Sequence, residues 1–155
     1  MRIELTTHEY LTAALIGFSR SYAAAFRGQR DKFPVGGDRY RNDIEGAAAE
    51  LAGGRGLSVY WPGFVDPGRE EFDLPGWGEV RWSARRDACL IVRQADDPER
   101  RYLLVTGQFG VYELRGWLYG REARRAEWER HRGAWFVPQS ALRSVEQLEL
   151  WEESA

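Results

Sequence analysis

The sequence is poor in the residues that form covalent crosslinks and soft metal centres. Cys89 is the only cysteine among 155 residues, and His8 and His131 are the only histidines. A single cysteine excludes an internal disulfide and a cysteine-based zinc site, and two histidines are too few for a multi-histidine metal centre. The apolar run around Cys89 indicates a buried thiol rather than a nucleophile. Carboxylates therefore remain the metal ligands to consider.

Lysine is almost absent as well. Lys32 is the only one, so arginine supplies nearly all the positive charge, and the net charge is -2 with a pI of about 5.8. A protein that coats nucleic acid is normally clearly basic. Any contact with nucleic acid must therefore come from local patches of arginine, whose planar fork suits phosphate.

Long hydrophobic runs are also missing. No stretch approaches the length of a membrane span, and Met1 to Leu5 lacks the apolar core of a signal peptide. We therefore expect a cytoplasmic protein with no membrane partner.

What is present indicates a folded domain. Hydrophobic residues make up 43% of the chain and aromatic residues 14%, which argues against disorder, and the mean hydropathy of -0.56 fits a soluble surface. A chain of this length can bury a real core. We expect one domain over 1–155, in which 1–38 form an N-terminal strand, helix and linker and 39–155 form the core.

Two helices are predicted near the N-terminus. Apolar residues recur at helical spacing over 8–26, and Thr6-Thr7 offers an N-cap. Tyr10 stands three residues after Thr7, where a full capping box would have Glu. A second apolar stripe predicts a helix over 40–52 that ends at Gly53-Gly54.

The rest of the chain alternates strands with short helices, which predicts an α/β or α+β fold. A tight connection at 94–99 suggests a hairpin. Strands are expected at 1–5, 57–61, 79–82, 88–94, 102–106, 111–119 and 134–137, with the hairpin joining the fourth and fifth of these, and helices at 121–132 and 140–151.

One spacing in the strand region suggests chemistry. Asp73, Glu79 and Arg81 form the pattern D-x5-E-x-R. Residues two apart on a strand share a face, so Glu79 and Arg81 project together, and a carboxylate from the preceding segment can join them. Two carboxylates are an ordinary way to hold Mg²⁺, and a nearby cation can steady phosphate charge. The competing interpretation is an exposed strand face with an ordinary Glu-Arg pair.

Further acids lie on either side of this motif. Glu50 adds a third carboxylate if its helix packs over the sheet. Glu45 is about 140° away from Glu50 on a helix at ~100° per residue, so we expect Glu45 to face solvent. Asp87 is a second candidate ligand, although an Asp at the entry to a strand more commonly caps a turn.

A cation–aromatic segment follows at Arg115-Gly116-Trp117. It predicts either stacking and phosphate contact with nucleic acid, or a core strand in which glycine permits a bulge; the latter is favoured. Arg121 and Arg124, with Arg125, could form a phosphate-binding edge, while most of 121–132 resembles a salt-bridged solvent face.

A signature runs through most of the chain from residue 43 onward. It comprises Asp43–Ala52, Val59-Tyr60-Trp61, Asp73, Glu79-Val80-Arg81, and residues 87–93, 102–107, 115–120 and 135–143. In these segments the chain resembles a family of uncharacterised bacteriophage proteins, and a phage-encoded protein would be expected in the host cell cytoplasm. The arrangement of acids also resembles the PD-(D/E)XK nuclease superfamily, in which a helix glutamate precedes an aspartate and a (D/E)-x-K pair on adjacent strands of a small mixed sheet.

The nuclease resemblance implies a small mixed sheet flanked by helices, with a restriction-endonuclease-like core. Position by position, Glu50 matches the helix acid, Asp73 the metal-binding aspartate and Glu79 the second metal ligand. Arg81 stands where the catalytic lysine belongs. Arginine does not deprotonate in proteins, so Arg81 is expected to hold a phosphate or polarise a water, not to act as a general base.

Three hypotheses follow. The first is a metal-dependent, nuclease-like phage protein that acts on DNA phosphodiesters with Mg²⁺, or Mn²⁺. The second is a catalytically inactive nuclease-fold module that binds nucleic acid or a host or phage protein, as the acidic net charge and Arg81 favour. The third is a small protein that acts on a host factor and has no role with nucleic acid.

Overall fold

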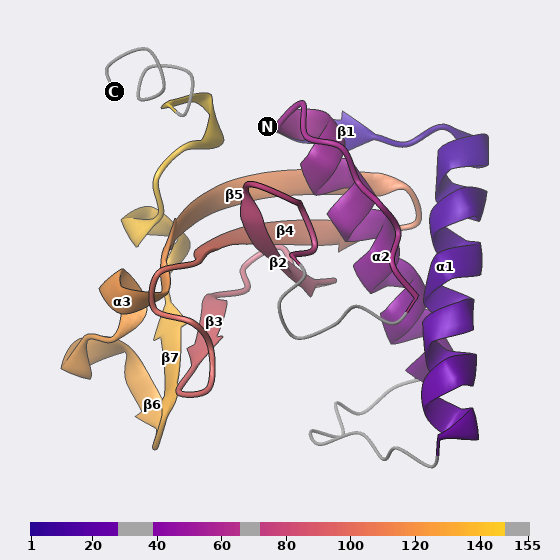
Figure 1. Cartoon of the computed structure of the whole chain (residues 1–155). Helices are drawn as coiled ribbons and strands as arrows, with labels where there is room; N and C mark the ends of the chain where they lie inside the picture. The colour runs from indigo at the N-terminus through magenta and orange to yellow at the C-terminus, as the bar shows by residue number, and fades with distance from the viewer. Residues whose placement is uncertain (28–38, 66–71, 148–155) are drawn as a thin grey trace.

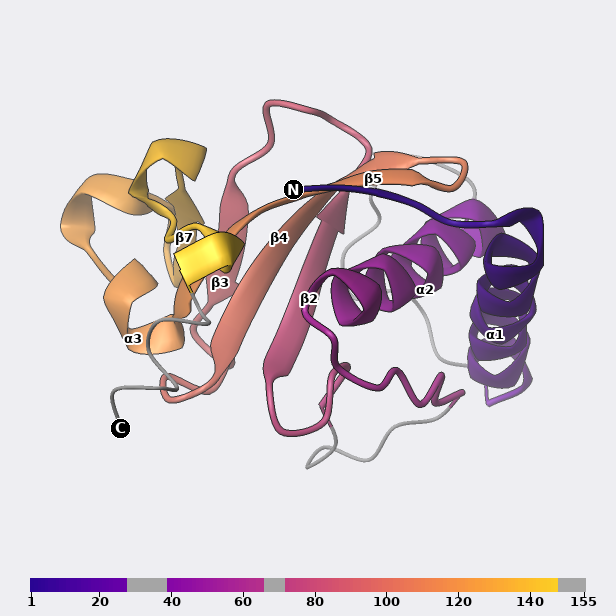
Figure 2. The same ribbon diagram turned by 90° about the horizontal axis from the view of Figure 1, so that it is seen from above.

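The computed structural model describes residues 1–27, 39–65 and 72–147 and arranges them in layers (Figure 1). Helix α1 (Thr7–Phe26) is the outermost layer and packs on α2 (Arg39–Gly56), which in turn covers a four-stranded sheet. A second, three-stranded sheet lies on the side of the molecule away from α1 and α2 (Figure 2). The predicted mixture of helices and small sheets is confirmed at this level.

The larger sheet is mixed. Its order is β1-β5-β4-β2, with β4 antiparallel to β5 at the centre and β2 parallel to β4 at one edge. A bulge in β5 sets Leu104 opposite Gly116 but Val105 opposite Leu114, which leaves Arg115 as the extra residue. The strands are β1 (Arg2–Glu4), β2 (Gly78–Ser83), β4 (Arg101–Gln108) and β5 (Val111–Tyr119).

The smaller sheet corrects the predicted hairpin. Strand β3 does not pair with β4; it pairs antiparallel with β7, with Leu90 opposite Val137. The prediction of a hairpin rested on the short connection between β3 and β4. The apolar side chains of β3 are instead buried against β7, a strand much later in the chain. The strands are β3 (Leu90–Arg93), β6 (Glu129–His131) and β7 (Ala134–Val137).

The helix predicted over 121–132 is wrong. Only α3 (Gly120–Ala123) and a 3₁₀ turn (Ala126–Trp128) form there before β6 begins. Two charged residues of this segment pair across the fold, Arg121 with Glu99 and Glu122 with Arg143, the latter at 2.5 Å. In place of the C-terminal helix, two further 3₁₀ turns (Gln139–Ala141, Val145–Gln147) are present, and the remainder of that prediction lies outside the described residues.

Helix α1 begins with a complete capping box that the sequence prediction missed by one residue. Thr6, not Thr7, is the N-cap; the Glu9 backbone N–H donates to the Thr6 hydroxyl, and the Glu9 carboxylate accepts the Thr6 backbone N–H at 2.7 Å. Counting from Thr6 places Glu9 three residues on, as the capping box requires.

Helix α2 continues through Gly53-Gly54, where the prediction ended it. A Cβ on Gly53 would lie 3.1 Å from Cδ2 of Leu103, so glycine here lets the helix approach the sheet closely. The segment at 57–61 then runs without strand pairing, and Ser58 adopts a positive φ of 55°. These two glycines permit close packing and do not end the helix.

Apolar side chains form two cores, one on each face of the larger sheet. The first lies between α2 and the sheet and includes Leu103, Val105 and Val80. The second lies between that sheet and the smaller one and includes Leu90, Leu104 and others. Within the described residues no helix has both the length and the apolar character required to cross a bilayer.

Candidate active site

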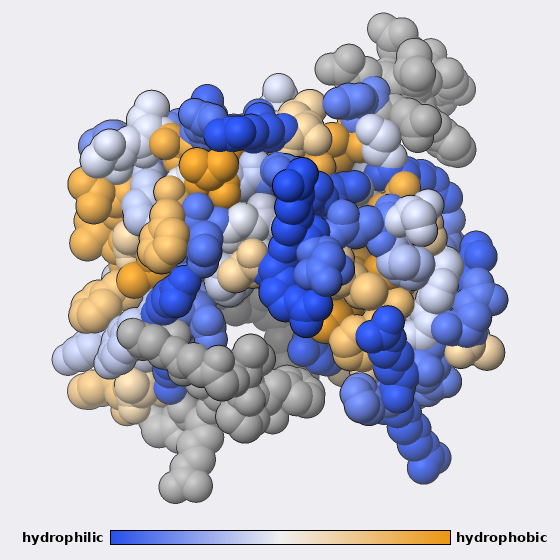
Figure 3. All heavy atoms as spheres, turned by 180° about the vertical axis from the view of Figure 1, so that it is seen from behind, coloured by the Kyte–Doolittle hydropathy of each residue, from blue (hydrophilic) through white to orange (hydrophobic). Residues whose placement is uncertain are grey.

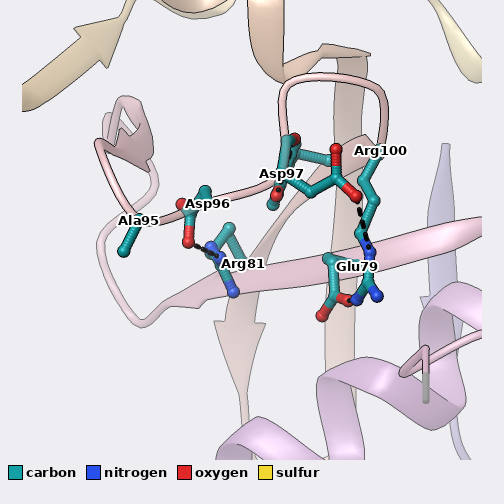
Figure 4. A pocket seen from close by; sticks show the side chains of 7 residues that line it. Glu79, Arg81, Ala95, Asp96, Asp97 and Arg100 are labelled. Atoms are coloured by element: carbon teal, nitrogen blue, oxygen red, sulfur yellow. Dashed lines mark hydrogen bonds and ion pairs between the residues drawn. The ribbon is translucent and has the colours of Figure 1, made fainter. Parts of the chain in front are cut away.

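Strand β2 places Glu79 and Arg81 on the face of the sheet opposite α2. The alternation predicted from sequence is present: Val80 is buried and packs against Gly53 of α2, while its two neighbours project the other way. Glu79 and Arg81 line a pocket of about 310 Å³ between β2 and the connection that leads into β4 (Figure 4). The remaining lining residues are Ala95, Asp96, Asp97, Arg100 and Tyr102.

Asp73 precedes β2 and meets Glu79, as the motif predicts. Its Oδ2 accepts the backbone N–H of Val80 at 2.9 Å, which fixes the carboxyl group at the start of the strand. Burial, the charge of Glu79 and a hydrogen bond shared with the Glu79 carboxyl together raise the pKa of Asp73 to about 6. Two carboxyl groups so close together repel one another when both are ionised, and a proton or a cation between them relieves that repulsion.

Glu50 lies on α2 as predicted, but its oxygens are already bonded. Arg20 of α1 donates to both carboxylate oxygens, at 2.6 and 2.8 Å, and the indole N–H of Trp61 donates to one of them at 3.0 Å. Burial, opposed by the Arg20 hydrogen bonds, raises the pKa of Glu50, and the charge of Asp73 adds to the rise. Glu50 is therefore an electrostatic neighbour of Asp73 but is bound directly to arginine.

Sequence reasoning did not find Arg20. Its signal is slight: it is the only arginine or lysine in a twenty-residue helix, and it turns inward. Besides Glu50 it bonds the Phe64 carbonyl through Nε at 2.7 Å. It therefore ties the outer helix to the acid that the motif analysis did identify.

Cations and acids alternate around the pocket. Arg81 pairs with Asp96 at 3.0 Å and lies over the Tyr102 ring, 5.0 Å from its centroid. Arg100 pairs with Glu79 at 2.5 Å (Figure 4). The Nε of Arg81 is buried and has no hydrogen-bond partner among the residues that the structure describes, so this donor is unsatisfied.

The other residues that were predicted to contact nucleic acid divide between the core and the surface. The Trp117 ring is only 7% exposed and packs edge-on against Trp77 and Tyr119, with centroids 6.3 and 5.6 Å away. It therefore belongs to the core, as the bulged-strand interpretation favoured, and has no face open for stacking. Arg115 is bonded to the Thr106 hydroxyl at 2.7 Å and paired with Glu113.

Arg121 and Arg124 lie on the surface beside the pocket. Arg121 pairs with Glu99 and stacks over Tyr119, and Arg124 donates to the Asp96 carbonyl at 2.7 Å. Both thus reach the connection that lines the pocket. Their contact with nucleic acid stays a prediction.

Asp87 lies in an exposed turn, where it pairs with Arg85 at 2.9 Å. Asp87 is not among the residues that line the pocket. The turn interpretation of this aspartate therefore accounts for its position.

The prediction that Glu45 faces solvent is wrong. Its carboxylate is 1% exposed and accepts hydrogen bonds from the hydroxyls of Tyr10 and Tyr112, at 2.8 and 2.6 Å, and from the Phe109 backbone N–H. Helix α2 is covered by α1 on one side and by the sheet on the other, so the face opposite Glu50 is buried too. Burial and the bond to Glu45 raise the pKa of Tyr112 and raise that of Tyr10 to about 12.

No protein-family model matches the chain, and no curated protein or solved structure is significantly similar to it. Among the residues that the structure describes, no three His, Cys, Asp or Glu side chains converge as a metal cluster. The candidate ligand set is the pair Asp73 and Glu79, with oxygen donors of the kind Mg²⁺ prefers when it keeps several waters.

Proposed function

We propose that the protein is a divalent-metal-dependent hydrolase of DNA phosphodiesters, with Asp73 and Glu79 as the metal ligands. The observation that carries the proposal is the contact between these two carboxyl groups beside an arginine-lined pocket. The donor set fits Mg²⁺ or Mn²⁺, because a cation between two oxygen ligands would remove the repulsion that raises the pKa of Asp73. The resemblance to the PD-(D/E)XK nuclease pattern supports DNA as the substrate.

The proposal includes a restriction-endonuclease-like core. Its support is the order of these residues and their elements along the chain. Glu50 lies on a helix, Asp73 lies at the entry to a strand, and Glu79 and Arg81 lie on that strand of a small mixed sheet. This order matches the nuclease pattern that the sequence resembles.

Three arginines would bind the substrate and position the acids. Arg81, which lines the pocket, would hold a phosphoryl oxygen, and Arg100 would join it when Glu79 turns to the metal. Neither guanidinium can take a proton from water, since arginine stays charged. A bound Mg²⁺ supplies Lewis-acid activation and a lower pKa for attacking water. Arg20 would keep Glu50 ionised and fixed behind Asp73.

The test is cleavage and metal binding by an Asp73→Asn variant. Purified protein is incubated with linear, single-stranded and branched DNA in Mg²⁺ or Mn²⁺, and Mn²⁺ binding is followed by calorimetry. We expect wild type to cut at least one substrate. A change in the groups that surround a metal's ligands typically costs about 10–100-fold in activity or metal affinity, so loss of a ligand in Asp73→Asn should lower the cleavage rate by more than that. The matched control is Asp87→Asn, an exposed carboxylate away from the pocket. Cleavage that survives Asp73→Asn would refute the site.

Arg81→Lys tests the departure from the nuclease pattern. Lysine can lose its proton near a cation, so we expect this variant to cleave faster than wild type, by up to about 100-fold, the lower end of what a general base contributes. The measurement is the single-turnover cleavage rate against pH. A slower variant would show that the paired donors of the guanidinium matter more than a removable proton.

A second candidate function is a nuclease-fold module that binds DNA without cutting it. The observation that favours it is that Glu50 and Glu79 each already pair with a guanidinium, from Arg20 and Arg100. DNA binding in a mobility-shift assay, with neither cleavage nor Mn²⁺ binding by wild type, would establish this alternative.

A further inference from the structure

Helix α1 is apolar on both of its long faces, but the described chain covers only one of them. The inner face packs on α2 through small residues: Ala13 and Gly17 are buried, and a Cβ on Gly17 would collide with the Asp43 carbonyl oxygen. The outer face carries large side chains that stay exposed. A helix that is hydrophobic all round is normally buried all round. Within the part of the chain that the structure describes, the outer face therefore lacks a cover.

The exposed side chains form one continuous stripe. Leu11, Leu15, Phe18 and Tyr22 are between 49% and 68% exposed, and Phe26 is 86% exposed. The Phe18 ring stacks on Tyr40 of α2 at 5.5 Å, which widens the stripe. Figure 3 shows hydrophobic residues gathered along the left edge of the molecule, on the side where α1 lies.

Charge is absent from this stripe. The two charged residues of α1, Glu9 and Arg20, both bond to other parts of the chain, Glu9 to Arg55 and Arg20 to Glu50. A helix that binds a membrane surface normally carries lysine and arginine along its polar face. An uncharged stripe suits instead another uncharged stripe, and a second copy of the same helix supplies one without repulsion.

The central part of the stripe is also palindromic in its spacing. Between Leu11 and Tyr22 the steps are 4, 3 and 4 residues, the same from either end. When two copies of α1 pack antiparallel about a two-fold axis, Leu15 meets Phe18 of the other copy, and Leu11 meets its Tyr22. Each aliphatic side chain then faces an aromatic one. Alternating steps of three and four residues are those of helices that pack side by side.

The area matches what a stable dimer needs. With side-chain areas of roughly 150–250 Å² for such large residues, the exposed surfaces of the five stripe residues and Tyr40 together amount to roughly 700 Å² per chain. A standard interface buries about 800 Å² on each partner. We propose that the protein forms a two-fold symmetric homodimer through antiparallel packing of the outer face of α1. This inference does not depend on the proposed hydrolase activity.

The test is a pair of charge variants, alone and mixed. Leu15→Glu and Phe18→Lys each place a charge at the centre of the interface, so each alone is expected to weaken dimerisation by at least about 100-fold. When the two variants are mixed in equal amounts, the introduced carboxylate of one chain faces the introduced ammonium group of the other. Analytical ultracentrifugation should give twice the 17.9 kDa chain mass for wild type and for the mixture, but a monomer for each variant.

Tyr60→Glu is the matched control, because Tyr60 is a large aromatic side chain, 78% exposed, outside the stripe. It should remain dimeric, and circular dichroism should show all variants folded. A monomeric wild type at tens of micromolar, a dimeric Leu15→Glu protein, or a mixture that stays monomeric would each overturn the proposal. A monomeric wild type that sediments with anionic lipid vesicles would assign the stripe to a membrane surface instead.

Discussion

Replacement of Glu45 by alanine is expected to lower the free energy of unfolding by about 3–5 kcal/mol. The Glu45 carboxylate accepts from Tyr10, Tyr112 and the Phe109 backbone N–H in the interior. Removing it leaves buried donors without an acceptor, at about 1–3 kcal/mol for each such group. Since Glu45 joins α1, α2 and the β4–β5 turn, the loss should appear as one cooperative shift in a urea or thermal unfolding curve.

Glu45→Gln and Glu127→Ala are the matched comparisons. Glutamine keeps one carbonyl acceptor and the side-chain length, so we expect it to cost about 1–2 kcal/mol. Glu127 has a side chain 66% exposed, and its loss should fall within about 0.5 kcal/mol. An unfolding midpoint for Glu45→Ala equal to that of Glu127→Ala would show that the buried carboxylate is not a structural link.

Asp73→Asn is expected to make the metal-free protein more stable at pH 8 and to leave its stability unchanged at pH 4. Burial and the neighbouring Glu79 raise the pKa of Asp73 from 3.8 to about 6 in the folded state. The contribution of Asp73 is then most favourable below about pH 4, where the carboxyl is protonated in both states, and is lost as pH rises to about 6. Asparagine resembles the protonated group and avoids this loss.

The expected gain at pH 8 is about 2 kcal/mol. One pKa unit corresponds to about 1.4 kcal/mol, and partial exposure of the carboxyl reduces the full value. The measurement is urea unfolding of both proteins between pH 4 and 8 with a chelator present. Asp87→Asn is the control, because the pKa of Asp87 is lowered by Arg85 and its exposed pair should contribute little.

Millimolar Mg²⁺ or Mn²⁺ should then stabilise wild type at pH 8 but not Asp73→Asn, since a ligand stabilises only the folded state that binds it. If Asp73→Asn were less stable than wild type at pH 8 without metal, the carboxylate would be a structural group and not a strained ligand.

Local pattern was enough to predict the parts of the fold that depend on one element at a time. The alternation of β2 correctly set Glu79 and Arg81 on one face, and the periodicity of α1 predicted its extent closely. The contact of Asp73 with Glu79 also followed, because a residue just before a strand returns near its start. Each of these needs only the geometry of a strand or helix.

What failed depended on which elements become neighbours. Glu45 was assigned to solvent because helical geometry separates it from Glu50, but α2 is buried on both sides. The partner of β3 is β7, which no local signal indicates. Arg20 reaches Glu50 only because α1 packs over α2. The periodicity of a helix or strand predicts which side chains share a face, but it does not predict which other element covers that face.

Strand β2 lies at an edge of its sheet, and such edges offer unpaired backbone groups to other chains. The Asp73 carboxyl accepts the hydrogen bond of the Val80 N–H, and Leu74 forms an isolated bridge with Gly78 at the start of the strand. The same aspartate proposed to bind metal therefore also blocks strand addition along this edge. Changes at Asp73 that remove its acceptor, such as alanine, would expose an aggregation-prone edge as well as a damaged site, whereas asparagine keeps the acceptor and the protection.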